Sequence, residues 1–66
     1  MGQENMVNQI ISFVRQNHES TASRAVYRRI LGSYPGSLDH DILTNLRDGL
    51  EAAQPEEVEA LYSIIS

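Results

Sequence analysis

The stretch from residue 37 to residue 53, SLDHDILTNLRDGLEAA, constrains the fold of this chain more than any other segment. Its apolar residues recur at spacings of three and four: Leu38, Ile42, Leu43, Leu46, Gly49, Leu50 and Ala53. At about 100° per residue, a helix collects these residues into a stripe roughly 140° wide. A helix with so wide an apolar stripe has to bury one side, and the other segments have to cover it.

Two further helices are predicted before this segment. The first spans about residues 4–17 and places six apolar residues on one broad face: Met6, Val7, Ile10, Ile11, Phe13 and Val14. Ser20 or Thr21 can cap the second, about residues 22–31, because either hydroxyl accepts a hydrogen bond from a free amide of the first turn. Gly32 is expected to end it, since glycine readily takes the left-handed conformation past a helix C-terminus.

The sequence YPGS at residues 34–37 predicts a type II turn, which places proline and then glycine at its two central positions. Ser37 is then expected to cap a helix over about residues 38–53. Gly49 costs this helix about 1 kcal/mol relative to alanine. Because Gly49 also lies within the apolar stripe, we expect another helix to cross closely there.

Pro55 separates this helix from a fourth one, over about residues 55–65. The residue before a proline is pushed out of the helical conformation, whereas proline itself is favoured at the first helical position. A chain of 66 residues makes one domain, and no segment alternates with the period of a strand. We therefore expect a single all-α domain over residues 1–66, a compact bundle of four short helices, mostly antiparallel.

Charge is distributed unevenly along the chain, whose formal net charge is −4. Residues 1–36 contain four arginines and two glutamates, a net charge of +2, whereas residues 37–66 contain one arginine and seven acidic residues, a net charge of −6. The turn at residues 34–37 is expected to fold a basic hairpin onto an acidic one. The two faces would also allow one copy to associate with another, in a manner weakened by salt.

Catalytic and metal-binding chemistry is not indicated. There is no cysteine, no glycine-rich phosphate loop and no paired-histidine motif, and the residues Asp39, His40 and Asp41 point in different directions on a helix. His18 is interpreted as a loop residue. We expect no enzyme activity, no cofactor and no metal. No apolar run has the length of a membrane span, and the absence of cysteine favours the cytoplasm.

The second predicted helix carries an arginine face formed by Arg24, Arg28 and Arg29. Its sequence, STASRAVYRRIL, resembles the recognition helix of lac-repressor-type helix-turn-helix proteins, which often read T-x-S-R-x-V. The resemblance implies that Thr21, Ser23 and Arg24 face DNA and that the other two arginines touch phosphate. The glycine expected in the preceding turn is absent, and the net negative charge opposes a polyanion. A solvated surface and a protein-binding patch are the alternatives.

The acidic half offers a second candidate surface, because Asp41, Asp48 and Glu51 lie away from the apolar stripe of their helix. Such a run is usually the solvated side of a helix, and the functional alternative is a surface that docks a basic partner. Four apolar residues at stripe edges are further candidates for an exposed interface: Ile11, Phe13, Ile64 and Ile65.

These features predict a small non-catalytic protein–protein interaction or regulatory domain, which binds a partner through an apolar groove flanked by charged faces. The predicted partner-binding residues are Arg24, Arg28, Arg29, Asp41, Asp48 and Glu51. The partner is another protein or a second copy of the chain, and no membrane is involved. The alternative is a helix-turn-helix-like DNA-binding protein that uses the arginine face.

Overall fold

The computed structural model describes residues 2–66, and within that range it contains four α-helices and no strand. Their bounds are α1 Gly2–Gln16, α2 Thr21–Ile30, α3 His40–Ala52 and α4 Pro55–Ile65. The expected all-α bundle of four short helices is thus confirmed. Each predicted boundary agrees with the observed one to within two residues, and α4 agrees at both ends.

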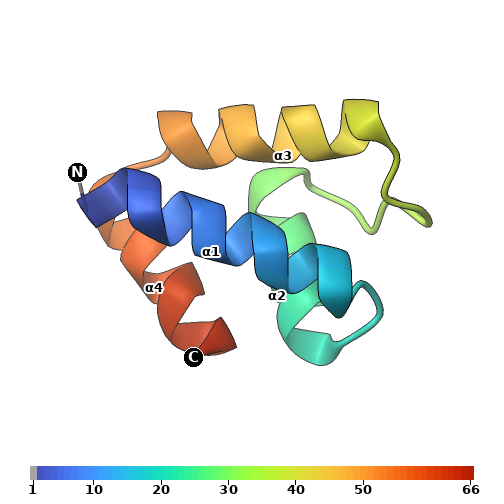
Figure 1. The fold of residues 1–66 in the computed structure, drawn as a ribbon, viewed down its shortest axis with the longest axis horizontal. Coiled ribbons are helices and arrows are strands. Elements are labelled where there is room, and N and C mark those ends of the chain that lie inside the picture. Colours follow the sequence, from blue (N-terminus) through green and yellow to red (C-terminus); the bar gives the residue numbers. More distant parts are fainter. Residues whose placement is uncertain (1) are drawn as a thin grey trace.

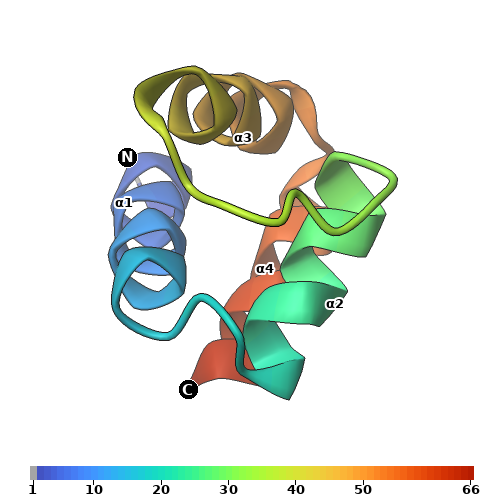
Figure 2. The same cartoon turned by 90° about the vertical axis from the view of Figure 1, so that its right-hand side faces the viewer.

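The four helices form two antiparallel pairs that pack across each other (Figures 1 and 2). In Figure 1, α1 and α3 run in opposite directions along the molecule, and in Figure 2 these two helices are viewed nearly end-on while α2 and α4 run across the view. Contacts within the pairs α1–α3 and α2–α4 are accompanied by contacts of α1 with α4 and of α2 with α3. Among helices that are consecutive in sequence, α2 and α3 contact each other, whereas α1 and α2, and α3 and α4, make few contacts.

This pairing differs from the two expected hairpins, one basic and one acidic. Each observed pair instead joins a helix from the first half of the chain to a helix from the second half. The opposite charges are therefore mixed in space, and α2, which carries the arginine face, lies against the acidic start of α4.

The core lies where the two pairs meet. Ten apolar residues are buried there: Val7, Ile10, Ile11, Val14, Val26, Tyr27, Leu46, Leu50, Val58 and Leu61. Complete burial of one such aliphatic side chain contributes about 1.5–3 kcal/mol. Helix α1 supplies four of the ten, which agrees with its contacts to both α3 and α4.

The connection between α2 and α3 differs in detail from the predicted type II turn. The amide of Ser37 donates to the carbonyl of Pro35 over 2.7 Å, so the hydrogen bond closes a ring of three residues, as in a γ-turn. Gly36 lies between them with φ +76°, a conformation that glycine adopts without strain. Gly32 has φ +86° just past the end of α2, as predicted.

The N-cap of α3 is Asp39, and the prediction that Ser37 caps this helix is wrong. The Asp39 Oδ1 atom accepts a hydrogen bond from the amide of Ile42 over 2.9 Å. A carboxylate serves this position as well as a hydroxyl does, and its charge is also favoured by the helix dipole. Because Ser37 belongs to the preceding turn, the helix begins two residues later than expected.

Gly49 lies at the crossing of α3 with α2, as predicted. A Cβ atom at this position would overlap the Cγ2 atom of Ile30, at the end of α2. Because Cγ2 is attached directly to the branched Cβ of isoleucine, it cannot move aside without a change of rotamer. The contact between α2 and α3 therefore depends on the missing side chain at this position.

The cap assignment predicts different effects for two neighbouring substitutions. Asp39→Ala should lower the free energy of unfolding by about 1 kcal/mol, because it removes the acceptor for the Ile42 amide. Ser37→Ala should change it by less than about 0.5 kcal/mol. Urea denaturation followed by circular dichroism measures both, and equal losses would contradict the assignment.

The helix crossing predicts that Gly49→Ala changes the free energy of unfolding in opposite directions in two backgrounds. Gly49→Ala should lower the free energy of unfolding by about 1 kcal/mol, because overpacking costs about 1–3 kcal/mol and the better helix former returns only about 1 kcal/mol. In an Ile30→Ala background the obstructing atom is gone, so the same substitution should stabilise by about 1 kcal/mol. Urea denaturation of the four-member cycle tests this, and an effect of one sign in both backgrounds would refute the crossing.

Candidate functional site

The three arginines of α2 are all exposed, but they have different surroundings. The Nε atom of Arg29 lies 2.7 Å from Oε2 of Glu57 on α4. Such a surface ion pair contributes about 0–1 kcal/mol to stability. Its more important effect is to neutralise Arg29, which removes this residue from the predicted arginine face.

Arg24 and Arg28 keep their charges available. The guanidinium of Arg24 lies over the ring of Tyr34, 5.2 Å from its centroid, in a cation–π contact. Arg28 makes no hydrogen bond or ion pair within residues 2–66. The structure thus brings together Arg24, Arg28 and the exposed Tyr34.

His18 supports the Tyr34 ring of this cluster, a role that is not predicted from the sequence. Its ring stacks on Tyr34 with centroids 5.2 Å apart and planes inclined by 17°. Its Nε2 atom lies 3.2 Å from the carbonyl oxygen of Gly36, and its Nδ1 atom lies 2.7 Å from the hydroxyl of Tyr27. Because a carbonyl only accepts, Nε2 carries the proton and Nδ1 accepts from Tyr27 in the neutral ring.

Tyr27 is completely buried, although its hydroxyl is polar. Burial raises the pKa of this hydroxyl above its ordinary value of 10.0, and a coulombic interaction with Tyr34 adds to the rise. The neighbouring Ser23 side chain lowers the pKa but only partly offsets these effects. The phenol is thereby held in its neutral, hydrogen-bonded form beside His18.

The turn between α1 and α2 is fixed by a network of serines. Ser20 caps α2, since its Oγ atom accepts from the amide of Ser23 over 3.1 Å, which decides between the two predicted caps. The buried hydroxyl of Ser23 donates to the carbonyl of Asn17 over 2.6 Å. The helix-turn-helix resemblance implies that Ser23 faces DNA, but a buried Ser23 cannot do so. Within residues 2–66 only Gly32 and Gly36 have positive φ, so this turn has no left-handed residue.

The predicted acidic residues Asp41, Asp48 and Glu51 are exposed on α3. Within residues 2–66 none of them forms an ion pair. Glu51 lines a shallow hollow between α1 and α3 together with Glu4, so it lies near another carboxylate rather than an arginine. The structure therefore does not unite the acidic and basic candidates in one site.

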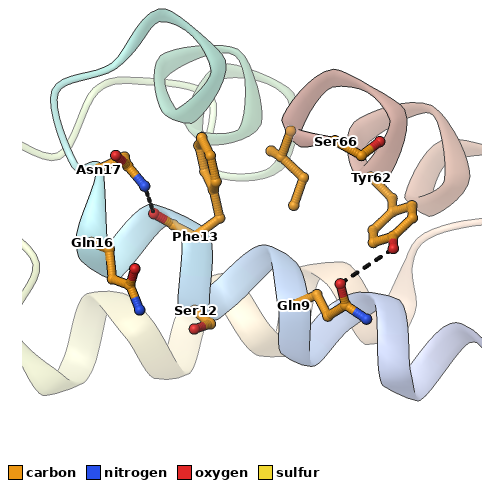
Figure 3. Close-up of a pocket in the computed structure, with 8 residues that line it drawn as sticks. Gln9, Ser12, Phe13, Gln16, Asn17, Tyr62 and Ser66 are labelled. Atoms are coloured by element: carbon orange, nitrogen blue, oxygen red, sulfur yellow. Dashed lines mark hydrogen bonds between the residues drawn. The ribbon is translucent and has the colours of Figure 1, made fainter.

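A groove lies between α1 and α4 (Figure 3). It has a volume of about 270 Å³ and is lined by Gln9, Ser12, Phe13, Gln16, Asn17, Tyr62, Ile65 and Ser66. None of these side chains is charged. The Tyr62 hydroxyl donates to Oε1 of Gln9 over 3.2 Å and so links the two walls.

The predicted exposed apolar edge is found in part at this groove. Phe13 and Ile65 are half-buried and form its apolar floor, and the neighbouring Ile64 is 49% exposed. Ile11 is only 6% exposed and belongs to the core, so its predicted exposure is wrong. Ile11 is covered because α1, the helix that carries it, packs against α3 as well as α4.

The part of the chain that the structure describes contains neither a candidate metal site nor a candidate membrane-spanning helix. Within residues 2–66 no three histidine or acidic side chains are placed to hold a metal ion together. His40 lines a hollow with Ile11, Leu43 and two arginines, and neither apolar side chains nor arginines ligate a metal cation. None of the helices in that range combines the length and the apolar character that crossing a membrane requires.

The raised pKa of Tyr27 predicts a loss of stability at alkaline pH. Above about pH 10 the unfolded chain loses this proton before the folded chain does, so the free energy of unfolding should fall as the pH rises toward the raised folded value. The chain has no lysine, so its three tyrosines dominate this range. Urea denaturation between pH 9 and about pH 11 should show a shallower fall in Tyr27→Phe than in Tyr62→Phe. Equal slopes would contradict the assignment.

Comparison with known proteins identifies no relative of this chain. No protein family matches the chain, and no significant match was found among curated proteins or solved structures.

Proposed function

We propose that this chain is a small non-catalytic interaction or regulatory domain, which binds a partner protein in the groove between α1 and α4. The observation that carries the proposal is the combination of an apolar floor, Phe13 and Ile65, with an uncharged polar rim. Ile64 extends the apolar surface beside it. Such a surface suits the apolar side of a partner helix that inserts one large side chain.

The size of the groove favours a side chain over a metabolite. Small-molecule sites usually enclose about 300–1,000 Å³ and bury most of their ligand, whereas this groove offers about 270 Å³ and is open. Its amide and hydroxyl rim can hydrogen-bond to a partner backbone without burying a charge. The charged residues outside the groove would steer the approach of the partner and set its specificity.

A cytoplasmic location is part of this proposal. The chain contains no cysteine, so it uses none of the disulfides that stabilise many small domains in oxidising compartments.

Filling the groove should abolish partner binding. Ser12 lines the groove and is exposed, so Ser12→Trp should occupy the space without removing a core residue. We expect amphipathic helical peptides selected against the chain to lose at least about tenfold in affinity for this variant. Ser63→Trp is the matched control, because Ser63 is exposed on α4 but does not line the groove.

Chemical-shift perturbation in the ¹⁵N-labelled chain identifies where the selected peptides bind. Peptides that perturb residues elsewhere, or that bind Ser12→Trp unchanged, would refute the groove as the docking site. A duplex DNA shift at low salt that is lost on Arg24→Ala with Arg28→Ala would favour the DNA-binding alternative instead.

A further inference from the structure

We infer that Arg24 and Arg28 form a second docking surface, which takes an acidic segment of another protein that presents two carboxylates about one helical turn apart. This surface is separate from the groove between α1 and α4, and the inference does not depend on the function proposed for that groove. It rests on the unpaired state of the two arginines and on the way in which one of them is held.

The two arginines are unpaired although the chain has more carboxylates than cations. The sequence contains nine acidic and five basic residues, yet the ion pair formed within residues 2–66 joins Arg29 to Glu57. Arg24 and Arg28 are spaced by four residues on α2, so their side chains are neighbours on one exposed face. An acidic protein thus keeps a local pair of cations free.

Arg24 is also held in place before any ligand binds. Its guanidinium lies over the Tyr34 ring, this ring stacks on His18, and His18 is hydrogen-bonded to Tyr27 and to the Gly36 carbonyl. A guanidinium held over an aromatic ring by a cation–π contact can still offer its N–H donors to a bidentate carboxylate. Holding the side chain in advance reduces the entropy that binding has to overcome.

The surrounding charge favours a short acidic segment over a longer polyanion. Glu57 lies beside Arg29, and the chain has a net charge of −4, so an extended duplex would meet repulsion from the chain beyond the arginine pair. A second copy of the chain would bring its own net charge of −4. A segment with two carboxylates meets only the local cations. If its carboxylates are about one helical turn apart, their spacing matches that of Arg24 and Arg28.

Titration with synthetic helical peptides tests the inference. The probe carries two glutamates four residues apart, and the matched control carries glutamines at both positions. Added to the ¹⁵N-labelled full chain at about 20 mM salt, the glutamate peptide should perturb the signals around Arg24, Arg28 and Tyr34. Raising the salt to about 150 mM should weaken it several-fold, and the glutamine peptide should not bind.

Three variants separate the contributions. Arg24→Gln with Arg28→Gln should reduce affinity at least tenfold, whereas Arg15→Gln with Arg47→Gln makes the same change in net charge on other helices and should reduce it far less. Tyr34→Leu keeps both arginines but removes the ring under Arg24. We expect it to weaken binding about threefold to tenfold while leaving the salt dependence unchanged, because the number of ionic contacts is the same.

Several results would overturn the inference. Equal binding of the two peptides, no binding of the glutamate peptide, or equal losses in the two double variants would each show that the arginine pair does not recognise carboxylates. Tighter binding of a short DNA duplex to the same residues would assign the surface to nucleic acid. A salt-sensitive dimer in sedimentation experiments, abolished by Arg24→Gln with Arg28→Gln, would assign it to a second copy.

Discussion

The width of the apolar stripes is the constraint on which this structure depends. A stripe that spans about 140° of a helix surface is too wide for a single neighbouring helix to cover. Each helix therefore contacts two others, and the crossed arrangement of two antiparallel pairs supplies these contacts with only four helices. Helix α1 shows this most clearly, because Val7, Ile10, Ile11 and Val14 are all buried between α3 and α4.

The same arrangement redistributes the charge of the chain. Pairing α2 with α4 places Arg29 beside Glu57, and pairing α1 with α3 places Asn8 beside Arg47, whose Nη1 atom donates to it over 2.7 Å. A polarity that is strong along the sequence is thereby reduced at the surface. Arg24 and Arg28 remain a basic pair on α2, and the guanidinium of Arg24 is held by Tyr34 rather than by a carboxylate.

The local features of the fold could be predicted from the sequence, whereas the pairing could not. Gly32, Gly49 and Pro55 act through backbone conformation and steric size, which are properties of single positions, and the structure confirms all three. Serine and aspartate are favoured almost equally at an N-cap, so the sequence alone does not decide between Ser37 and Asp39 as the cap of α3. His18 gave no signal, since it acquires its role only when Tyr27, Tyr34 and Gly36 converge on it in three dimensions.

The short turn between α1 and α2 connects the two candidate surfaces. Asn17 lines the groove between α1 and α4, and the next residue, His18, supports the ring beneath Arg24. The Asn17 carbonyl accepts from the buried Ser23, which in turn is held by the Ser20 cap. One hydrogen-bonded turn thus fixes the position of an apolar groove relative to a cationic pair. A partner with an apolar anchor and an adjacent acidic segment would therefore meet both features at a fixed spacing, without first having to order a loop.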